Sequence, residues 1–381
     1  MRKLQKLMLG IVVPAMAAAG ATTITPARAD KDNKLTLGGY GVLYVGGEYV
    51  TKTGTTALIK TNQAHVEYFL PANKNSKKLP VIMVHGSQQT GVNFLSTPDG
   101  REGWALDFVR QGHPVYVVDQ PARGRSVYHP QTNGTLSGGD TNSVQTRFTA
   151  PEKFPGSWPQ AKYHTQFPGT GLLGDKYFDQ FFASQVENAS SDNEVMTTLA
   201  VTALLDQIGP SILMTHSQSG SFTWPIADAR PNLVKGILAI EPSGPPVSGG
   251  KVYGVSPSPL TYSPAIASPS ELQFETIPAD NPDLNPCQQQ KAPARQLIRL
   301  KKIPTLVVTS EASYHAQYDQ CTARYLQQAG VPVDYVRLET VGIRGNGHMM
   351  MIEKNSAKIS KLLMKWVNKY VKSPHKNVAS R

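Results

Sequence analysis

The six residues Thr215-His216-Ser217-Gln218-Ser219-Gly220 have the clearest capacity for chemistry in this sequence. An apolar run at 211–215 predicts a strand before them, and residues 218–229 predict a helix after them. A serine on such a strand-to-helix turn is strained and exposed, so it can act as a nucleophile. We expect this to be Ser217, because a histidine commonly precedes the nucleophile. In a shifted register the nucleophile would be Ser219, and the non-catalytic interpretation is a plain Ser-rich turn.

A serine nucleophile needs donors for the oxyanion that forms on its substrate. The backbone N–H of Gln218, at the start of the predicted helix, can supply one. His85-Gly86-Ser87-Gln88 follows an earlier apolar run at 81–85, and we expect the Ser87 N–H to supply the second. His-Gly is equally compatible with a tight turn that has no catalytic role.

The serine also needs a general base and an acid that orients this base. His348 ends the glycine-rich stretch Gly342-Ile-Arg-Gly-Asn-Gly, after the last predicted strand, and we expect it to be the base. Two carboxylates follow predicted strands and could serve as the acid, Glu241 and Glu311. Asp119 precedes the serine and falls outside the order serine, acid, histidine, so we expect it to shape a turn together with nearby arginines.

These residues sit in an order of elements typical of an α/β protein. Residues 35–50 and 65–70 alternate like antiparallel strands, whereas short apolar runs at 81–85, 115–119, 211–215, 236–240, 305–309 and 333–338 suit buried parallel strands. Helices are expected at 101–111, 218–229, 315–328 and 353–371. Strands alternating with helices predict a mostly parallel central sheet with helices on both faces.

Two long stretches interrupt this order, at about 127–180 and 242–293. The first is rich in glycine, proline and aromatic residues, and the second in proline and serine. Long segments of this kind inside a domain are usually lids or binding loops, although they can be surface additions without a binding role. We expect both to form a lid or cap, and Trp158, Tyr163 and Phe167 of the first to line the substrate site.

Several of these motifs together resemble the Alcaligenes-type secreted bacterial esterases of the α/β-hydrolase superfamily. They are His85-Gly86, Thr97-Pro-Asp-Gly-Arg101, Val118-Asp-Gln-Pro-Ala-Arg-Gly-Arg-Ser126, the serine stretch, Glu241-Pro242 and Gly345-Asn-Gly-His348. The resemblance spans about residues 35–370 and implies the α/β-hydrolase fold. It also implies a Ser-His-Glu triad in which Glu241, and not Glu311, is the acid. The type member has two adjacent cysteines where this chain has Ser87 and Gln88, so a role of that pair is absent here.

The expected function is therefore hydrolysis of small carboxylic esters through an acyl-enzyme, without a metal or organic cofactor. A lactonase or an acyltransferase could use the same triad. A non-catalytic binding protein that kept the fold is the alternative from another class. A burst assay with a small activated ester would distinguish it from an enzyme.

The first 29 residues of the chain and its two cysteines indicate an exported protein. Residues 1–29 resemble a signal peptide, with a basic start, an apolar stretch and Ala27-Arg-Ala before Asp30, although an uncleaved anchor is the alternative. We expect residues 30–381 to form the secreted or periplasmic hydrolase domain, without stable membrane insertion. Cys287 and Cys321 should then form a disulfide.

The formal net charge is +11, and removal of the four basic residues of this signal would leave +7. We find no nucleic-acid-binding motif in the sequence. Much of the remaining charge falls late, at 354–376, where a solvated basic helix and tail explain it.

Overall fold

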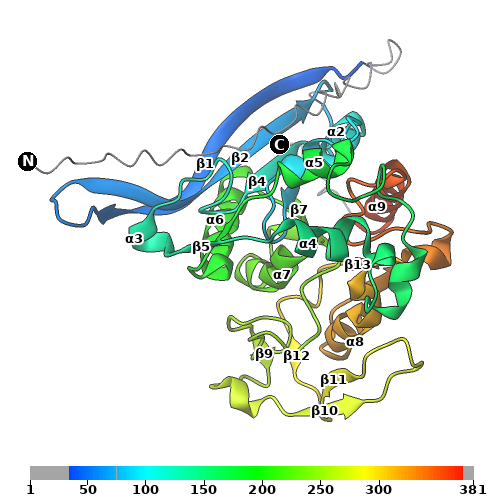
Figure 1. The fold of residues 1–381 in the computed structure, drawn as a ribbon. Helices are drawn as coiled ribbons and strands as arrows, with labels where there is room; N and C mark the ends of the chain where they lie inside the picture. Colours follow the sequence, from blue (N-terminus) through cyan, green and yellow to red (C-terminus); the bar gives the residue numbers. More distant parts are fainter. Residues whose placement is uncertain (1–33, 74, 372–381) are drawn as a thin grey trace, which may run out of the picture.

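An eight-stranded sheet forms the centre of the molecule, with strand order β1-β2-β4-β3-β7-β8-β13-β14 (Figure 1). The computed structural model describes residues 34–73 and 75–371, so the expected signal peptide lies outside the described residues. β1 and β2 are antiparallel, as are β2 and β4, and the neighbours from β4 to β14 are parallel. The strands are β1 Leu37–Thr51, β2 Leu58–Pro71, β3 Val81–Val84, β4 Val115–Asp119, β7 Ser211–His216, β8 Val234–Ile240, β13 Thr305–Thr309 and β14 Val333–Arg337.

Helices cover both faces of this sheet because its central strands are apolar on both sides. Met83 of β3 packs in one core with α2 and α9, and its neighbour Ile82 packs in a second core with α6, α7 and α8. Successive side chains of a strand point to opposite faces, so one short apolar run supplies both cores. The described helices of these two cores are α2 Trp104–Arg110, α6 Asn193–Ile208, α7 Gln218–Ala229, α8 Asp319–Gln328 and α9 Ser356–Tyr370.

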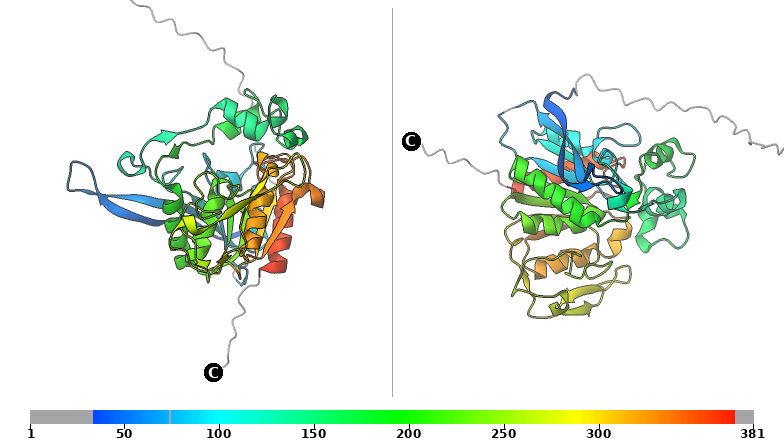
Figure 2. Two further views of the ribbon diagram at one scale, coloured as in Figure 1. Left: turned by 90° about the horizontal axis from the view of Figure 1, so that it is seen from below. Right: turned by 90° about the vertical axis from the view of Figure 1, so that its left-hand side faces the viewer.

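The two expected insertions lie on different sides of this body (Figure 2). The segment 127–180 contains α3 Pro130–Asn133, β5 Leu136–Ser137, α4 Thr141–Val144, a π-helix Gln145–Thr149, 3₁₀ turns Pro151–Lys153 and Pro159–Tyr163, and α5 Lys176–Phe182. The segment 242–293 contains β9 Tyr262–Ser263, a 3₁₀ turn Pro269–Glu271, β10 Phe274–Ile277 and β11 Cys287–Gln290. The remaining short elements are α1 Val92–Leu95, β6 Asn188–Ala189, β12 Gln296–Leu297 and the 3₁₀ turns Tyr314–Gln317 and Leu338–Val341.

The expected α/β architecture is confirmed, but the structure differs from the sequence analysis at two helices. Helix α6 was not expected. Its apolar residues do not all lie on one face, because Val195 and Leu199 are exposed, so its sequence lacks a clear amphipathic pattern. The helix expected at 315–328 begins only at Asp319. Before it, Tyr314–Gln317 form a 3₁₀ turn, and Tyr318 between the two has φ −143° and ψ −8°, which is not helical.

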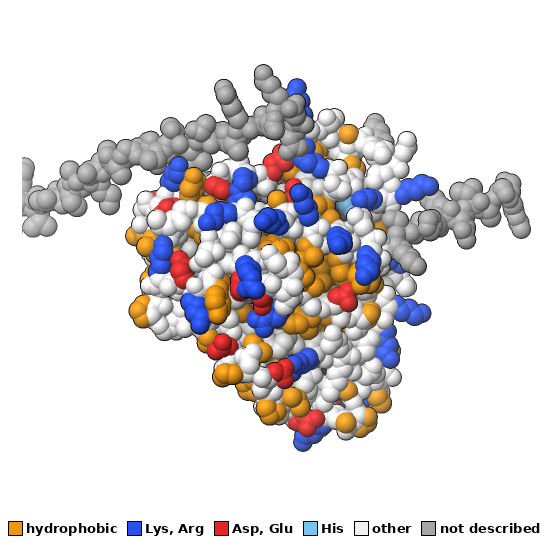
Figure 3. Space-filling model, turned by 90° about the vertical axis from the view of Figure 1, so that its right-hand side faces the viewer, with side chains coloured by type: hydrophobic (Ala, Val, Ile, Leu, Met, Phe, Trp, Pro, Cys, Tyr) orange, Lys and Arg blue, Asp and Glu red, His pale blue; other side chains and the backbone are white. Residues whose placement is uncertain are grey.

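On the side of the molecule that carries α9, basic side chains are scattered among other residues (Figure 3). Figure 3 shows the side that carries α9, where Lys and Arg side chains alternate with acidic and apolar ones. The lysines of α9 lie opposite its buried residues, such as Ile359 and Leu363. This matches the solvated basic helix that the sequence predicted. None of the described helices has the length and hydropathy that crossing a membrane requires.

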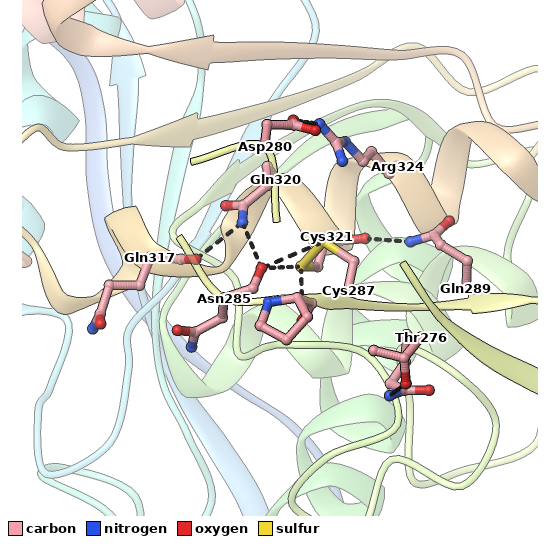
Figure 4. The surroundings of a disulfide bond; sticks show 11 residues. Thr276, Asp280, Asn285, Cys287, Gln289, Gln317, Gln320, Cys321 and Arg324 are labelled. Atoms are coloured by element: carbon pink, nitrogen blue, oxygen red, sulfur yellow. Dashed lines mark hydrogen bonds and ion pairs between the residues drawn. A yellow bond between two sulfur atoms is a disulfide. The ribbon is translucent and has the colours of Figure 1, made fainter. Parts of the chain in front are cut away.

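The predicted disulfide between Cys287 and Cys321 is confirmed and joins β11 to α8 (Figure 4). Both cysteines are buried. Hydrogen bonds reinforce the junction, since Gln289 donates to the Cys321 carbonyl and Gln328 donates to the Gln290 carbonyl. The insertion 242–293 is therefore fastened to the outer side of α8.

Replacing both cysteines by serine should lower the free energy of unfolding by about 3–4 kcal/mol, because the unfolded chain regains the entropy of an open loop. Urea denaturation followed by circular dichroism measures this change. A reducing agent should shift the midpoint of the wild type to that of the double variant and leave the double variant itself unchanged. Equal midpoints for the oxidised wild type and the double variant would contradict the prediction.

Candidate active site

Ser217 lies at the turn between β7 and α7 with φ 57° and ψ −118°, a conformation that is strained for a residue with a side chain. Two glycines let neighbouring backbone approach this turn. A Cβ on Gly86 would lie 2.8 Å from the Cβ of Ser217, and one on Gly220 would lie 2.3 Å from the Cα of Pro242. The tight turn therefore exposes the Ser217 hydroxyl at the carboxyl ends of the parallel strands.

Ser219, the alternative nucleophile, has a different position. Its side chain is buried, and its hydroxyl donates to the carbonyl of Val84 at the end of β3, at 2.8 Å. It also accepts a hydrogen bond from the backbone N–H of His216. Ser219 thus ties β3 to the turn, and it is not among the residues that line the cavity above Ser217.

His348 lies between Ser217 and Glu241. Its Nε2 is 2.9 Å from the Ser217 Oγ, and its Nδ1 is 2.5 Å from a carboxylate oxygen of Glu241. The ring stacks against Phe148, at 5.5 Å between centroids, and against His315, at 4.7 Å. Burial lowers the pKa of His348 well below its usual value, so the neutral imidazole that can accept a proton predominates at neutral pH.

Glu241 is fully buried at the end of β8, with φ 43°. Besides His348, it accepts hydrogen bonds from the Ser310 N–H at 2.7 Å and the Ser313 hydroxyl at 2.6 Å. Burial and the nearby Asp319 raise the pKa of Glu241, whereas the bonds from Ser313 and Ser310 act in the opposite direction and favour the carboxylate. Both oxygens of the Glu241 carboxyl group thus have donors.

Glu311, the alternative acid, contacts the loop that carries His348 and not the imidazole itself. One carboxylate oxygen accepts from Arg344 at 2.7 Å and the other from the backbone N–H of Gly345 at 2.8 Å. The structure thus brings Ser217, His348 and Glu241 together. Glu311 fixes the start of the Gly345-Asn346-Gly347 turn that precedes His348.

A cavity of about 130 Å³ opens above Ser217. Of the two expected oxyanion donors, Ser87 lines this cavity, whereas Gln218 is not among its lining residues and is the first residue of α7. The cavity wall also holds Gln88 and several residues that the sequence analysis did not single out, namely Gln89, Ser143, Arg147, Phe148, Tyr314 and Met349. Among these residues, Tyr314 has its hydroxyl 3.3 Å from His348 Nε2.

The three aromatic residues expected to line the site are not among the residues of the cavity wall. Phe167 is buried in a hydrophobic core beside Phe181. Tyr163 is 47 % exposed. Trp158 donates to the carbonyl of Ala312 and packs edge-on against Tyr314, so it supports the wall from behind. The segment 127–180 reaches the cavity through Ser143, Arg147 and Phe148 instead.

A group of potential metal ligands coincides with this centre. Side-chain donor atoms of Glu241, His315 and His348 lie within 4.8 Å of one another. These side chains are engaged otherwise, since His348 bonds both Ser217 and Glu241, and His315 Nδ1 lies 2.9 Å from Asp319. The donor set therefore fits a hydrogen-bonded relay better than a metal site.

Comparison with known proteins identifies the family. No family model matches the chain. It is 43 % identical over 337 residues to the probable secreted lipase phiG of Fungal sp. (strain ATCC 74256), which covers 86 % of this chain and 88 % of that protein. The chain belongs to the α/β-hydrolase family of secreted lipases and esterases. A solved structure of a novel bacterial esterase, 21 % identical, has the same fold with a TM-score of 0.63 over 88 % of this hydrolase and 97 % of that chain.

A buried histidine connects the insertion 127–180 of this hydrolase to the loop that carries His348. His164 lies between two carboxylates, with Nδ1 2.9 Å from Glu152 and Nε2 2.8 Å from Glu353. Glu353 also accepts from the backbone N–H of Gly347, next to His348. Burial alone would lower the pKa of His164, but the hydrogen bonds with Glu152 and Glu353 outweigh it and raise the pKa to about 9.

This raised pKa predicts a stability that depends on pH. The contribution of His164 is complete below its unfolded pKa of about 6.5 and is lost as the pH rises through about 9. The melting temperature of the wild type, followed by circular dichroism, should therefore fall across this window. Glu152→Gln removes one of the two carboxylates and should flatten the fall. Identical slopes in the two proteins would show that this cluster does not set the pH dependence.

Proposed function

We propose that this ester hydrolase acts through Ser217 as nucleophile, His348 as general base and Glu241 as the acid that orients the base. The observation that supports this most is the continuous chain of short contacts from Ser217 Oγ through both nitrogens of His348 to Glu241. The second support is the strained backbone of Ser217, which is what a nucleophile on a strand-to-helix turn requires.

The reaction follows from these positions. The Ser217 Oγ forms a bond to the ester carbonyl carbon, the carbonyl electron pair moves to the oxygen, and the hydroxyl proton passes to His348 Nε2. Collapse of this intermediate breaks the bond to the alkoxide, which takes the proton from His348, and an acyl-enzyme is left. Water then attacks the acyl carbon in the same way and releases the acid. Glu241 stabilises the imidazolium that forms in each step.

Hydrogen bonds in the loop after β3 support Ser87 as the first oxyanion donor. The Gly86 carbonyl, in the same peptide, accepts from His85 Nδ1 at 2.8 Å and from the buried Arg123 at 3.0 Å. The His85 Nε2 accepts from the Gln120 N–H, which leaves the proton on Nδ1. Because the C=O and N–H of a trans peptide point in opposite directions, these two donors turn the Ser87 N–H away from Arg123. Within the described residues this N–H has no acceptor.

The Gln218 N–H is the proposed second donor. Gln218 is the first residue of α7, and the backbone N–H groups of the first turn of a helix have no partner inside the helix. Tyr314 adds a hydroxyl near the reacting atoms. Burial raises the pKa of Tyr314 to about 12, so this phenol stays protonated and can donate a hydrogen bond at neutral pH.

The chemistry fits a secreted or periplasmic location. The curated relative is a probable secreted lipase, and the buried disulfide requires an oxidising compartment to form. Hydrolysis by this mechanism takes a small-molecule ester and water as reactants, and the side chains and backbone N–H groups of the protein carry it out.

The nucleophile can be tested against its neighbour in the same turn. Ser217→Ala should lower kcat by about 10⁴-fold or more, because only binding and oxyanion stabilisation would remain. Ser219→Ala loses only structural hydrogen bonds, to Val84 and from His216, and should cost far less activity. Steady-state kinetics with an activated ester measures both, and a fluorophosphonate probe should label Ser217 on peptide mapping. A larger loss in Ser219→Ala would transfer the role to Ser219.

The acid can be tested with two matched variants. Glu241→Gln should lower kcat by about 10⁴-fold, since the amide cannot stabilise the imidazolium and permits the wrong tautomer. Glu311→Gln keeps an acceptor for the Gly345 N–H and should lose less than about tenfold. Circular dichroism should show both variants folded. The opposite ranking would assign the acid to Glu311 and leave the roles of Ser217 and His348 unchanged.

A further inference from the structure

The cavity above Ser217 has a cation in its wall without a matching anion. Arg147 lines the cavity and is exposed. None of the described residues that line the cavity is acidic, and no carboxylate of the described residues lies within ion-pair distance of Arg147. Arg344, another arginine near the site, has such a partner in Glu311. The buried Arg123 has no ion pair among the described residues either, but it donates to the Gly86 carbonyl and is not among the residues of the cavity wall.

The backbone and two aromatic rings hold this guanidinium beside the reacting atoms. Arg147 belongs to the π-helix Gln145–Thr149, a wide turn of a kind that often occurs at functional sites. Its guanidinium carbon lies 4.5 Å from the centre of the Tyr314 ring and 5.9 Å from that of Phe148. The Tyr314 hydroxyl in turn lies 3.3 Å from His348 Nε2. The Arg147 guanidinium is therefore only one side chain, that of Tyr314, away from the base that faces an ester bound at Ser217.

The size of the cavity restricts what can occupy it. Its volume of about 130 Å³ is below the range of about 300–1,000 Å³ that is usual for pockets that enclose drug-sized ligands. Polar side chains, Gln88, Gln89 and Ser143, share the wall with Phe148 and Met349. A short ester with a polar end fits this volume, and the polar side chains of the wall can contact such an end.

We propose that the natural substrate of the enzyme is a short ester that carries a carboxylate, and that Arg147 binds this carboxylate. A guanidinium can form two parallel hydrogen bonds to a carboxylate, which fixes orientation as well as adding binding energy. Half-esters of short dicarboxylic acids are the simplest members of this class. The inference rests on the proposed function of Ser217 and names the substrate class for that site.

The test compares two substrates of equal shape that differ in charge. Methyl hydrogen glutarate carries the carboxylate, and methyl glutaramate replaces it by a neutral amide. Their hydrolysis by the full secreted protein can be followed with a pH-stat. The wild type should have the higher kcat/KM for methyl hydrogen glutarate, and this preference should weaken as salt is added, because salt screens an exposed ion pair.

Arg147→Met should lower kcat/KM for methyl hydrogen glutarate by about 10–100-fold, as expected for loss of a charged hydrogen-bonded pair, and change that for methyl glutaramate by less than about twofold. Arg147→Lys should retain part of the preference. Lys162→Met is the matched control, since Lys162 is an exposed cation of the same insertion and is not among the residues of the cavity wall. It should leave both substrates unaffected.

The outcomes separate this inference from the function on which it rests. Equal losses on both substrates in Arg147→Met would mean that Arg147 only braces Tyr314, and would overturn the inference while the esterase mechanism stands. A wild type that hydrolyses the neutral ester as well as the charged one would overturn it too. A wild type that hydrolyses neither these esters nor an activated ester would overturn the proposed function together with the inference.

Discussion

The hydrogen bond between Glu241 and His348 is the interaction around which the rest of the site is arranged. A buried carboxylate is costly unless donors surround it, and the chain meets this cost with donors that come from separate elements. Ser310 and Ser313, which follow β13, donate to Glu241, and the His348 loop brings the imidazole from beyond β14. Glu311 and Glu353 hold this loop through the backbone N–H groups of Gly345 and Gly347. Much of the buried polar network thus supports the placement of one imidazole ring.

Backbone strain accompanies this arrangement. Gln88, Ser217 and Glu241 have positive φ angles, and they follow three neighbouring strands, β3, β7 and β8. Each such residue costs of order 1–3 kcal/mol and persists only where its surroundings enforce it. Here the surroundings are two buried cores and close backbone contacts at Gly86 and Gly220, which admit no side chain. Packing around the sheet therefore maintains the strained backbone conformation that exposes Ser217.

The sequence predicted the parts of this arrangement that local chemistry determines. Short apolar runs gave the parallel strands, and the positions of Ser217, Glu241 and His348 at strand ends followed from the order of elements. The choice between Glu241 and Glu311 could not be made from strand ends alone, because it depends on which carboxylate the loop at 342–348 meets. The cavity wall was harder to predict. Tyr314 and Arg147 reach it only because the chain departs from a regular α-helix at Tyr314–Gln317 and Gln145–Thr149, and hydrophobic periodicity does not reveal such departures.

The residues that line the outer wall of the cavity come from a few short segments of the chain. Gln88 and Gln89 belong to the loop after β3, Tyr314 and Met349 flank the proposed triad, and Ser143, Arg147 and Phe148 come from one run of six residues in the insertion 127–180. The insertion 242–293, which the disulfide fastens to α8, supplies none of the described lining residues. Related enzymes can therefore diverge in substrate preference by exchanging a single surface segment while the scaffold and its reaction are inherited unchanged. Residues 143–148 are thus a natural target for grafting a new specificity onto this scaffold.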